Sequence, residues 1–264
     1  MRREMEPDLR SVDLPTARVL LTNDDGIDAA GFAVLEEIIR PMVGELWVCA
    51  PAEGHSGASA MVSLRREIEV QERGLRRYAV TGRPADTVLA ALRLVMKDAP
   101  PDLVLSGINH GLNVGVDMIY SGTVGAAICA AGNGVPAVAF SADHVSGQPV
   151  ASHTWDDVRT HLPAVLGRIC WFGFAPNGAY GVNFPSRVAH PDPQLCRQGQ
   201  SVDTMHYVAV DGAPGRHILH HQDGDRSLDA GTDGAAIAAG RIGITPLTLD
   251  RTDRDLLHRA AEAL

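Results

Sequence analysis

The sequence predicts an α/β fold: a Rossmann-like core of three layers, with a mainly parallel sheet between two layers of helices. Short apolar runs alternate with helix-like stretches over about the first 140 residues, which is typical of parallel strands connected by helices. The runs are continuously apolar, as strands buried on both faces are. Several of them end abruptly at polar, glycine-containing loops.

The first three elements form a strand–helix–strand unit. Residues 18–21 form a short apolar run that predicts a strand, and residues 31–40 place apolar side chains at helical spacing. Residues 46–50 form a second apolar run, which Pro51 stops. This order is the βαβ unit of a doubly wound sheet.

The rest of the predicted core continues the alternation. Pro84 fits the first turn of a helix, because its missing N–H group is not needed there. The expected elements are extended stretches near 61–70 and 78–80, a helix over 84–96, a strand over 103–105 with a loop to 122, a helix over 124–131 and a strand over 135–140.

The second half shows weaker periodicity. We expect helices over 155–171, 232–239 and 253–264, strands over 180–184 and 241–245, an extended segment over 201–210, and a loop over 217–228. Residues 1–17 read as a flexible extension, and residues 18–264 as one domain with a core to about 185 and a C-terminal oligomerisation region over about 186–264.

Bulk composition narrows the function class. The chain has 264 residues and a formal net charge of −9, which argues against duplex nucleic acid as a partner. The N-terminal residues lack the apolar stretch of a signal peptide or membrane anchor. The four cysteines form no C-x-x-C pair, so we expect a protein of the reducing cytoplasm.

The first polar cluster is Asn23-Asp24-Asp25-Gly26, directly after the first strand. Gly26 permits a sharp turn that can bring both carboxylates toward one cation, and hard oxygen ligands suit Mg, Mn or Ca. The alternative is an Asx turn that only caps the following helix. The cluster alone leaves both interpretations open.

The second cluster, residues 54–59, follows the second strand and contains Ser56 between flexible residues. Its hydroxyl can face a metal or a phosphate. The pattern Gly54-x-Ser56-x-Ala58 also approaches the nucleophile elbow of serine hydrolases, but residues 51–53 separate it from the strand. A plain surface loop is the third interpretation.

The third cluster spans residues 106–115 and 120–125, between a buried strand and a helix. Its glycines let backbone amides approach an anion, and the helix start offers unpaired N–H groups. Asn109 and Asn113 can offer oxygen to a metal or nitrogen to a phosphate, and glycine for tight packing alone is the alternative. All three loops follow parallel strands, whose carboxyl ends share one edge of the sheet.

Taken together, these segments resemble the SurE family of survival phosphatases, also called 5′-nucleotidases and related to acid phosphatases. The resemblance rests on residues 20–27, Ala50-Pro51 with residues 56–59, residues 106–115, residues 119–124, and the late segments 231–233 and 244–247. The departures lie at residues 29–31, 53–55 and Gly234, and they leave the substrate open.

This resemblance implies a Rossmann-like core with a smaller C-terminal region whose β/α elements are swapped between subunits of a homodimer or homotetramer. It implies one divalent cation per subunit, Mg or Mn, held by the residues matching Asp24, Asp25, Ser56 and Asn109. The implied reaction is hydrolysis of a nucleoside 5′-monophosphate, or a 3′-monophosphate, to nucleoside and phosphate. The chain itself would need no membrane.

Within that reaction we expect the phosphate oxygens to be held near Asn113, Ser121, Gly122 and Thr123. Asp24 or Asp25 can also serve as base or nucleophile, and the sequence does not decide between them. Two alternatives stay open: a metal-free serine hydrolase that uses Ser56, and a non-catalytic nucleotide-binding protein on the same scaffold.

Overall fold

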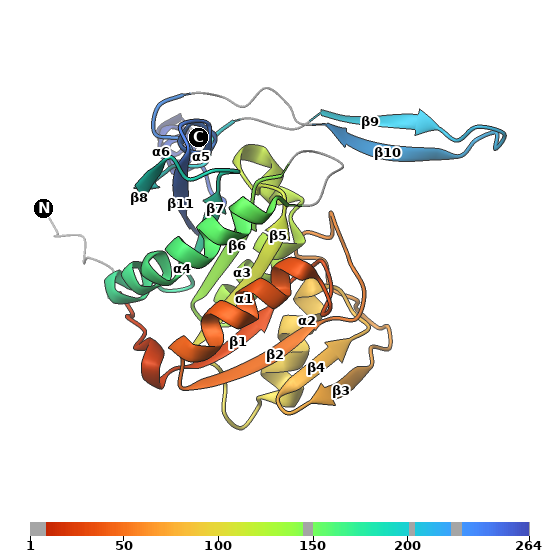
Figure 1. The fold of residues 1–264 in the computed structure, drawn as a ribbon. Coiled ribbons are helices and arrows are strands. Elements are labelled where there is room, and N and C mark those ends of the chain that lie inside the picture. Colours follow the sequence, from red (N-terminus) through yellow and green to blue (C-terminus); the bar gives the residue numbers. More distant parts are fainter. Residues whose placement is uncertain (1–8, 145–149, 201–203, 223–228, 264) are drawn as a thin grey trace, which may run out of the picture.

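A computed structural model of the chain describes residues 9–144, 150–200, 204–222 and 229–263. Its centre is a nine-stranded sheet in the order β3-β4-β2-β1-β5-β6-β7-β11-β8 (Figure 1). The strands of this sheet are β1 (Arg18–Thr22), β2 (Glu45–Pro51), β3 (Val70–Gly74), β4 (Arg77–Val80), β5 (Leu103–His110), β6 (Ala137–Ala142), β7 (Ala179–Phe184), β8 (His190–Leu195) and β11 (Arg241–Leu247).

Most neighbouring strands in this sheet are parallel. Strand β1 pairs in parallel with β2 and β5, and β6 pairs in parallel with β5 and β7. The antiparallel pairs lie toward the two sides, between β3 and β4 and between β7 and β11. The predicted α/β fold with a mainly parallel sheet is therefore confirmed.

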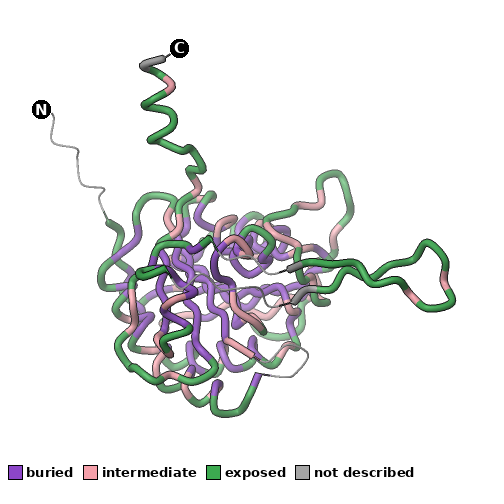
Figure 2. The backbone as a smooth tube through the Cα atoms, turned by 90° about the horizontal axis from the view of Figure 1, so that it is seen from above, coloured by how far each residue is buried: buried purple, intermediate pink, exposed green. Residues whose placement is uncertain are grey.

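Helices α1 (Ala30–Ile39) and α4 (Ser152–Phe172) pack on one face of the sheet, and α2 (Pro84–Ala90) and α3 (Gly122–Gly132) pack on the other. Helix α5 (Asp233–Ala238) packs against β11 and β7, whereas α6 (Arg254–Ala263) is largely exposed and projects from the body (Figure 2). Shorter turns are the 3-10 helices η1 (Leu14–Thr16), η2 (Arg40–Met42) and η4 (Gly115–Ile119), and η3 (Ala91–Val95), a π-helical turn that continues α2.

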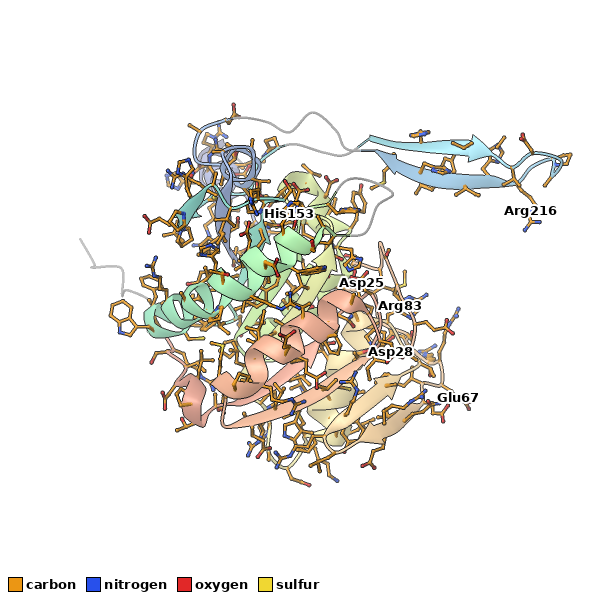
Figure 3. All side chains as sticks on the ribbon, viewed as in Figure 1. Asp25, Asp28, Glu67, Arg83, His153 and Arg216 are labelled. Carbon is orange, nitrogen blue, oxygen red and sulfur yellow. The ribbon has the colours of Figure 1, made fainter. Side chains whose placement is uncertain are left out.

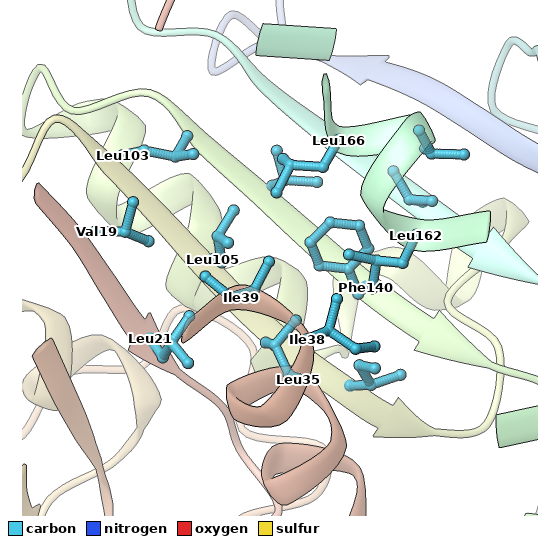
Figure 4. Close-up of a cluster of buried hydrophobic side chains, with 14 of the residues drawn as sticks. Val19, Leu21, Leu35, Ile38, Ile39, Leu103, Leu105, Phe140, Leu162 and Leu166 are labelled. Carbon is cyan, nitrogen blue, oxygen red and sulfur yellow. The ribbon is translucent and has the colours of Figure 1, made fainter. Parts of the chain in front are cut away.

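Alternation along β1 divides the core into two layers. Val19 and Leu21 belong to the cluster under α1 and α4, which Figure 4 shows, whereas Leu20 belongs to the cluster under α2 and α3. Successive side chains of a strand point to opposite faces, so one apolar run supplies both layers. This arrangement explains why the strand reads as continuously apolar.

The structure corrects several expected elements. Strand β5 continues through Ser106 to His110, so the first part of the expected loop is strand. Residues 61–69 form no strand, and their apolar Met61 and Leu64 are exposed. Strand β8 was not expected, because it carries Pro191 and Pro193; its position at the edge of the sheet tolerates them.

A second correction concerns the segment expected to be a loop over 217–228. Residues His217–Gln222 form strand β10, which pairs with β9 (Thr204–Ala209) in a two-stranded antiparallel arm; residues 223–228 lie outside the described part. The arm extends away from the body and is exposed (Figure 2). Strand β9 agrees with the extended segment expected over 201–210, whereas β10 carries three histidines and no regular alternation, so its sequence resembles a polar loop.

The predicted division near residue 185 stays a prediction. Strands β8 and β11, beyond that residue, complete the main sheet, whereas β9 and β10 form the separate arm. Over the described residues, no helix combines the length and apolar character needed to cross a bilayer.

Candidate functional site

The acidic loop begins where β1 ends. The side-chain amide of Asn23 donates to the carbonyl of Gly26 at 2.7 Å, and Gly26 has a φ of +100°, a region that favours glycine. Helix α1 begins at Ala30 after Ala29, with no side-chain cap. The loop therefore contains a turn closed by the side chain of Asn23. Neither Asp24 nor Asp25 caps the following helix.

Asp24 is held from the start of α3. It is only 3% exposed, its Oδ1 accepts a hydrogen bond from the Thr123 hydroxyl, and a Cβ on Gly122 would lie 2.7 Å from its Oδ2. Burial, together with the charge of Asp25, raises the pKa of Asp24 to about 6, although the hydrogen bond from Thr123 opposes that rise. Gly122 therefore admits a carboxylate that any other residue would displace.

Asp25 lies beside the end of β5 and is less buried than Asp24. Its Oδ2 accepts a hydrogen bond from the backbone N–H of His110 at 3.3 Å. Burial raises the pKa of Asp25, although the His110 amide and the charges of His110 and His144 oppose that rise. Both adjacent acids thus favour a state in which a proton or a cation relieves their charge.

The loop that carries Ser56 contacts both other loops. The backbone N–H of His55 donates to the carbonyl of Asp24 at 2.7 Å, and Ser59 bonds through its hydroxyl to the carbonyl of Ile119 at 2.7 Å. Ser56 lies in an exposed turn between these two anchors. The expected convergence of three loops at one edge of the sheet is therefore present in the fold.

Gly125 marks where this loop meets α3. A Cβ at Gly125 would overlap the backbone carbonyl of Ser59. A backbone atom cannot move aside as the end of a side chain can, so the loop and the helix touch here only because residue 125 has no side chain.

Asn109 ends the first part of the third cluster with a fixed amide. Its nitrogen donates to the carbonyl of Gly111 at 2.8 Å, which leaves Oδ1 as the group that can face a cation. Its neighbour His110 contacts Asp25, so Asn109 lies one residue from the acid pair.

Asn113 is held by residues that the sequence did not indicate. Its side-chain nitrogen donates to the Ser141 hydroxyl at 2.7 Å, and Asn183 bonds to both its backbone N–H and its carbonyl, at 2.8 and 2.9 Å. One signal in the sequence could have identified Asn183: it is a polar residue within the apolar strand β7, and a buried amide needs hydrogen-bond partners. The expected phosphate contact of Asn113 stays a prediction, because its nitrogen already has a partner.

The start of α3 is likewise partly used within the protein. The Ser121 hydroxyl accepts the N–H of Val124 as the N-cap, and Thr123 is bonded to Asp24. Helix N-termini attract anions, and here Asp24 is one such anion. The expected phosphate contacts at Ser121, Gly122 and Thr123 remain predictions.

A second residue missed as a site component is Asp233, at the start of α5. Its carboxylate is fully buried and accepts three backbone N–H groups, from Gly115 at 2.8 Å, Gly199 at 2.9 Å and Gly234 at 2.8 Å. This contact fixes the C-terminal part of the chain to η4, between Asn113 and Ser121. The sequence offered Thr232-Asp233 only as part of a family resemblance.

The donor set fits a hard divalent cation. No group of three or more His, Cys, Asp and Glu side chains suited to a metal occurs in the described part of the chain, so a cation here needs neutral oxygens besides the two acids. The Asn109 amide oxygen, near the end of β5, and the Ser56 hydroxyl, on the adjoining loop, are such groups. The raised pKa values of both acids indicate a charge that a cation would neutralise.

Together these features define a class: a parallel α/β protein with a carboxylate pair held against a helix start at the carboxyl edge of its sheet. The family model described as survival protein SurE matches residues 19–205. The chain belongs to the SurE family.

Relatives match over nearly their full length. One named 5′-nucleotidase SurE 1, from Burkholderia lata, is 40% identical and covers 94% of this chain and 96% of its own. One named 5′-nucleotidase SurE, from Erythrobacter litoralis, is 40% identical and covers 93% and 98%. The crystal structure of the SurE protein from Aquifex aeolicus aligns with a TM-score of 0.78 at 26% identity, over 94% of this chain and 99% of that one.

Proposed function

We propose that this protein is a divalent-cation-dependent phosphatase that hydrolyses nucleoside 5′-monophosphates to nucleoside and phosphate. The observation that carries the proposal is the Asp24–Asp25 pair, held with raised pKa values where three loops meet. Membership of a family whose relatives are named 5′-nucleotidase supports the substrate class. Hydrolysis of 3′-monophosphates is a second activity to measure.

We assign the cation, Mg or Mn and one per chain, to Asp24, Asp25, Ser56 and Asn109. When bound, such an ion acts as a Lewis acid that withdraws negative charge from the phosphate. Asp24 is fixed by Thr123 and buried against Gly122, so its role is to hold the ion in one position. Asn109 is oriented for the same role by its bond to Gly111.

The chain's own groups then bind and orient the phosphate. The Ser121 hydroxyl and the backbone N–H of Gly122 lie at the start of α3, where the helix dipole favours negative charge. The Thr123 hydroxyl donates a hydrogen bond to Asp24, so its contribution is to position that carboxylate. Asn113, in the loop that leads to this helix start, is fixed by its bonds to Ser141 and Asn183.

The direct test is release of inorganic phosphate from AMP by metal-free protein, before and after addition of Mn²⁺ or Mg²⁺. We expect no release without the ion and recovery when it is restored. Full activity after rigorous chelation would exclude the metal mechanism. Calorimetry that shows tight AMP binding with no phosphate release under any metal would instead favour a non-catalytic nucleotide-binding protein.

The serine hydrolase alternative receives no support from the geometry. A nucleophilic serine needs a base within hydrogen-bond reach, and in the described part of the chain no hydrogen bond joins Ser56 to a histidine. Ser56 also lies in an exposed turn and not at a strand-to-helix elbow. The variants Asp24→Asn and Ser56→Ala separate the two mechanisms, because only the hydrolase requires Ser56→Ala to abolish turnover completely.

We also propose that the protein is a cytoplasmic homodimer or homotetramer. The four cysteines are all free, which suits a reducing compartment. The β9–β10 arm exposes apolar side chains that a second copy would cover: Met205, Tyr207, Val208, Ile218 and Leu219. Light scattering coupled to size exclusion measures the assembly, and a monomer at micromolar concentration would contradict it.

A further inference from the structure

Two aromatic rings lie at the end of β5, and one of them belongs to the residue whose backbone contacts Asp25. Neither ring has a part in the proposed hydrolysis. The rings of His110 and Trp155 have centroids 5.8 Å apart and are tilted by 49°. The backbone N–H of His110 is the group that donates to Asp25, at 3.3 Å. One residue therefore connects the ring pair to the acid cluster.

Trp155 is held by packing against the hydrophobic core. It is half-buried in the first turn of α4, packs against the core cluster of α1 and β5, and its ring would lie 3.1 Å from a Cβ on Gly31. Gly31 thus leaves room for the indole. Figure 3 labels Asp25 and His153, the second residue of α4, which lie toward the same edge of the sheet.

His110 supplies an exposed ring above that support. It is the last residue of β5, and its side chain is exposed to solvent. A third flat ring is close, because a Cβ on Gly111 would lie 3.1 Å from Cε1 of His144. Flat, fixed rings with an accessible face are the platforms on which nucleobases stack.

We propose that His110 and Trp155 form the subsite that binds the base of the nucleoside monophosphate, with His144 at its border. This inference rests on the proposed function, because it assigns a binding site to the nucleoside part of the same substrate. The His110 ring belongs to the residue whose backbone N–H contacts Asp25, so the base subsite adjoins the acid pair. Stacking tolerates any base, so the platform selects for nucleosides and not for one base.

The other aromatic residues fit this role less well. Trp47 already stacks on Tyr78, with centroids 6.2 Å apart, away from the acid loop on β2 and β4. Trp171 lies at the far end of α4, sixteen residues from Trp155 along the helix. Tyr120 is near Ser121, but it follows the short turn η4 and has no core-packed ring beneath it in the described structure.

A binding measurement tests the platform without any turnover. Tryptophan emission is titrated with adenosine, and with ribose as the control, in wild type, Trp155→Phe and Trp171→Phe. We expect adenosine to change the emission of wild type and of Trp171→Phe, and ribose to leave it unchanged. An equal response in Trp155→Phe, or no adenosine response in wild type, would overturn the subsite.

A kinetic measurement then separates the platform from the phosphatase itself. The ratio of kcat/KM for AMP to that for ribose 5-phosphate is compared in wild type, His110→Ala and Trp155→Leu, which keeps an apolar side chain in the core. Loss of one stacking partner should lower the ratio about tenfold. An unchanged ratio in both variants overturns the subsite, whereas release of no phosphate from either ester by wild type overturns the proposed function instead. If Trp155→Leu fails to fold, the ratio measured for His110→Ala, a substitution of an exposed side chain, still tests the subsite.

Discussion

The two halves of the site differ in how they are held. Asp24, Gly122 and Thr123 form a buried half, in which a side chain added to Gly122 would collide with Asp24. Ser56 and His110 form an exposed half on loop and strand ends. The buried half is fixed by close packing and keeps an electrostatically unfavourable carboxylate, whereas the exposed half is free to meet a substrate.

This difference predicts opposite responses to mutation. In the buried half, function and stability oppose each other, because a carboxylate that suits a cation is costly to bury without one. In the exposed half, a side chain contributes to binding while adding little to the fold. Four substitutions test this contrast.

The largest effect is expected from Asp24→Asn. Removing a charged ligand should lower phosphate release from AMP by a factor on the order of a thousand, the loss of several kcal/mol of transition-state stabilisation. The pKa of Asp24 rises from its ordinary value of 3.8 to about 6 in the folded protein, so the metal-free fold loses stability as the pH rises through this interval and stays destabilised above it. The variant should therefore be more stable than wild type at pH 8, by roughly 3 kcal/mol. Denaturant unfolding of metal-free protein measures this, and a less stable variant would contradict the strained-carboxylate account.

Gly125→Ala should be strongly destabilising. The new methyl group would overlap the Ser59 carbonyl, so loop or helix must shift, at about 3 kcal/mol or more. The matched control is Gly167→Ala within α4, where nothing lies within 4 Å of the new Cβ; it should gain up to about 1 kcal/mol. Thermal unfolding of both variants measures the difference. Similar Tm values for Gly125→Ala and Gly167→Ala would contradict a tight contact between the loop and the helix.

Asn183→Ala tests the contact that holds Asn113. It leaves the buried N–H and carbonyl of Asn113 without their partners, which should cost about 2 kcal/mol. Because the loop leads to the start of α3, kcat for AMP should fall as well. Unchanged kcat with lowered stability would show that Asn183 serves the fold alone.

Ser56→Ala should have the smallest effect on stability, because Ser56 is exposed and no hydrogen bond from its side chain is described. The loss of a neutral supporting ligand should lower kcat/KM by about tenfold and raise the Mn²⁺ concentration needed for half-maximal activity. Its Tm should match that of wild type. A large loss of Tm would place Ser56 in the buried half.

The sequence was sufficient for those features that local rules govern. Apolar runs between helices predicted the parallel sheet, and the rule that parallel strands end at one edge predicted that Asp24, Ser56 and Asn109 lie at that edge. Asn109 proved to be the next-to-last residue of β5, where a loop had been expected. The bond between Thr123 and Asp24 spans 99 positions and that between Asp233 and Gly115 spans 118. Such contacts leave no local pattern, and strand β10 was missed because its histidines, His217, His220 and His221, make the segment polar like a loop.

The central claim is that the acid pair holds one divalent ion per chain. Calorimetric titration of metal-free protein with Mn²⁺ tests it most directly, with wild type, Asp24→Asn and Gly167→Ala compared under the same conditions. The account predicts one ion per chain in wild type and in Gly167→Ala, and no measurable binding in Asp24→Asn. Undiminished binding of one ion by Asp24→Asn would contradict it.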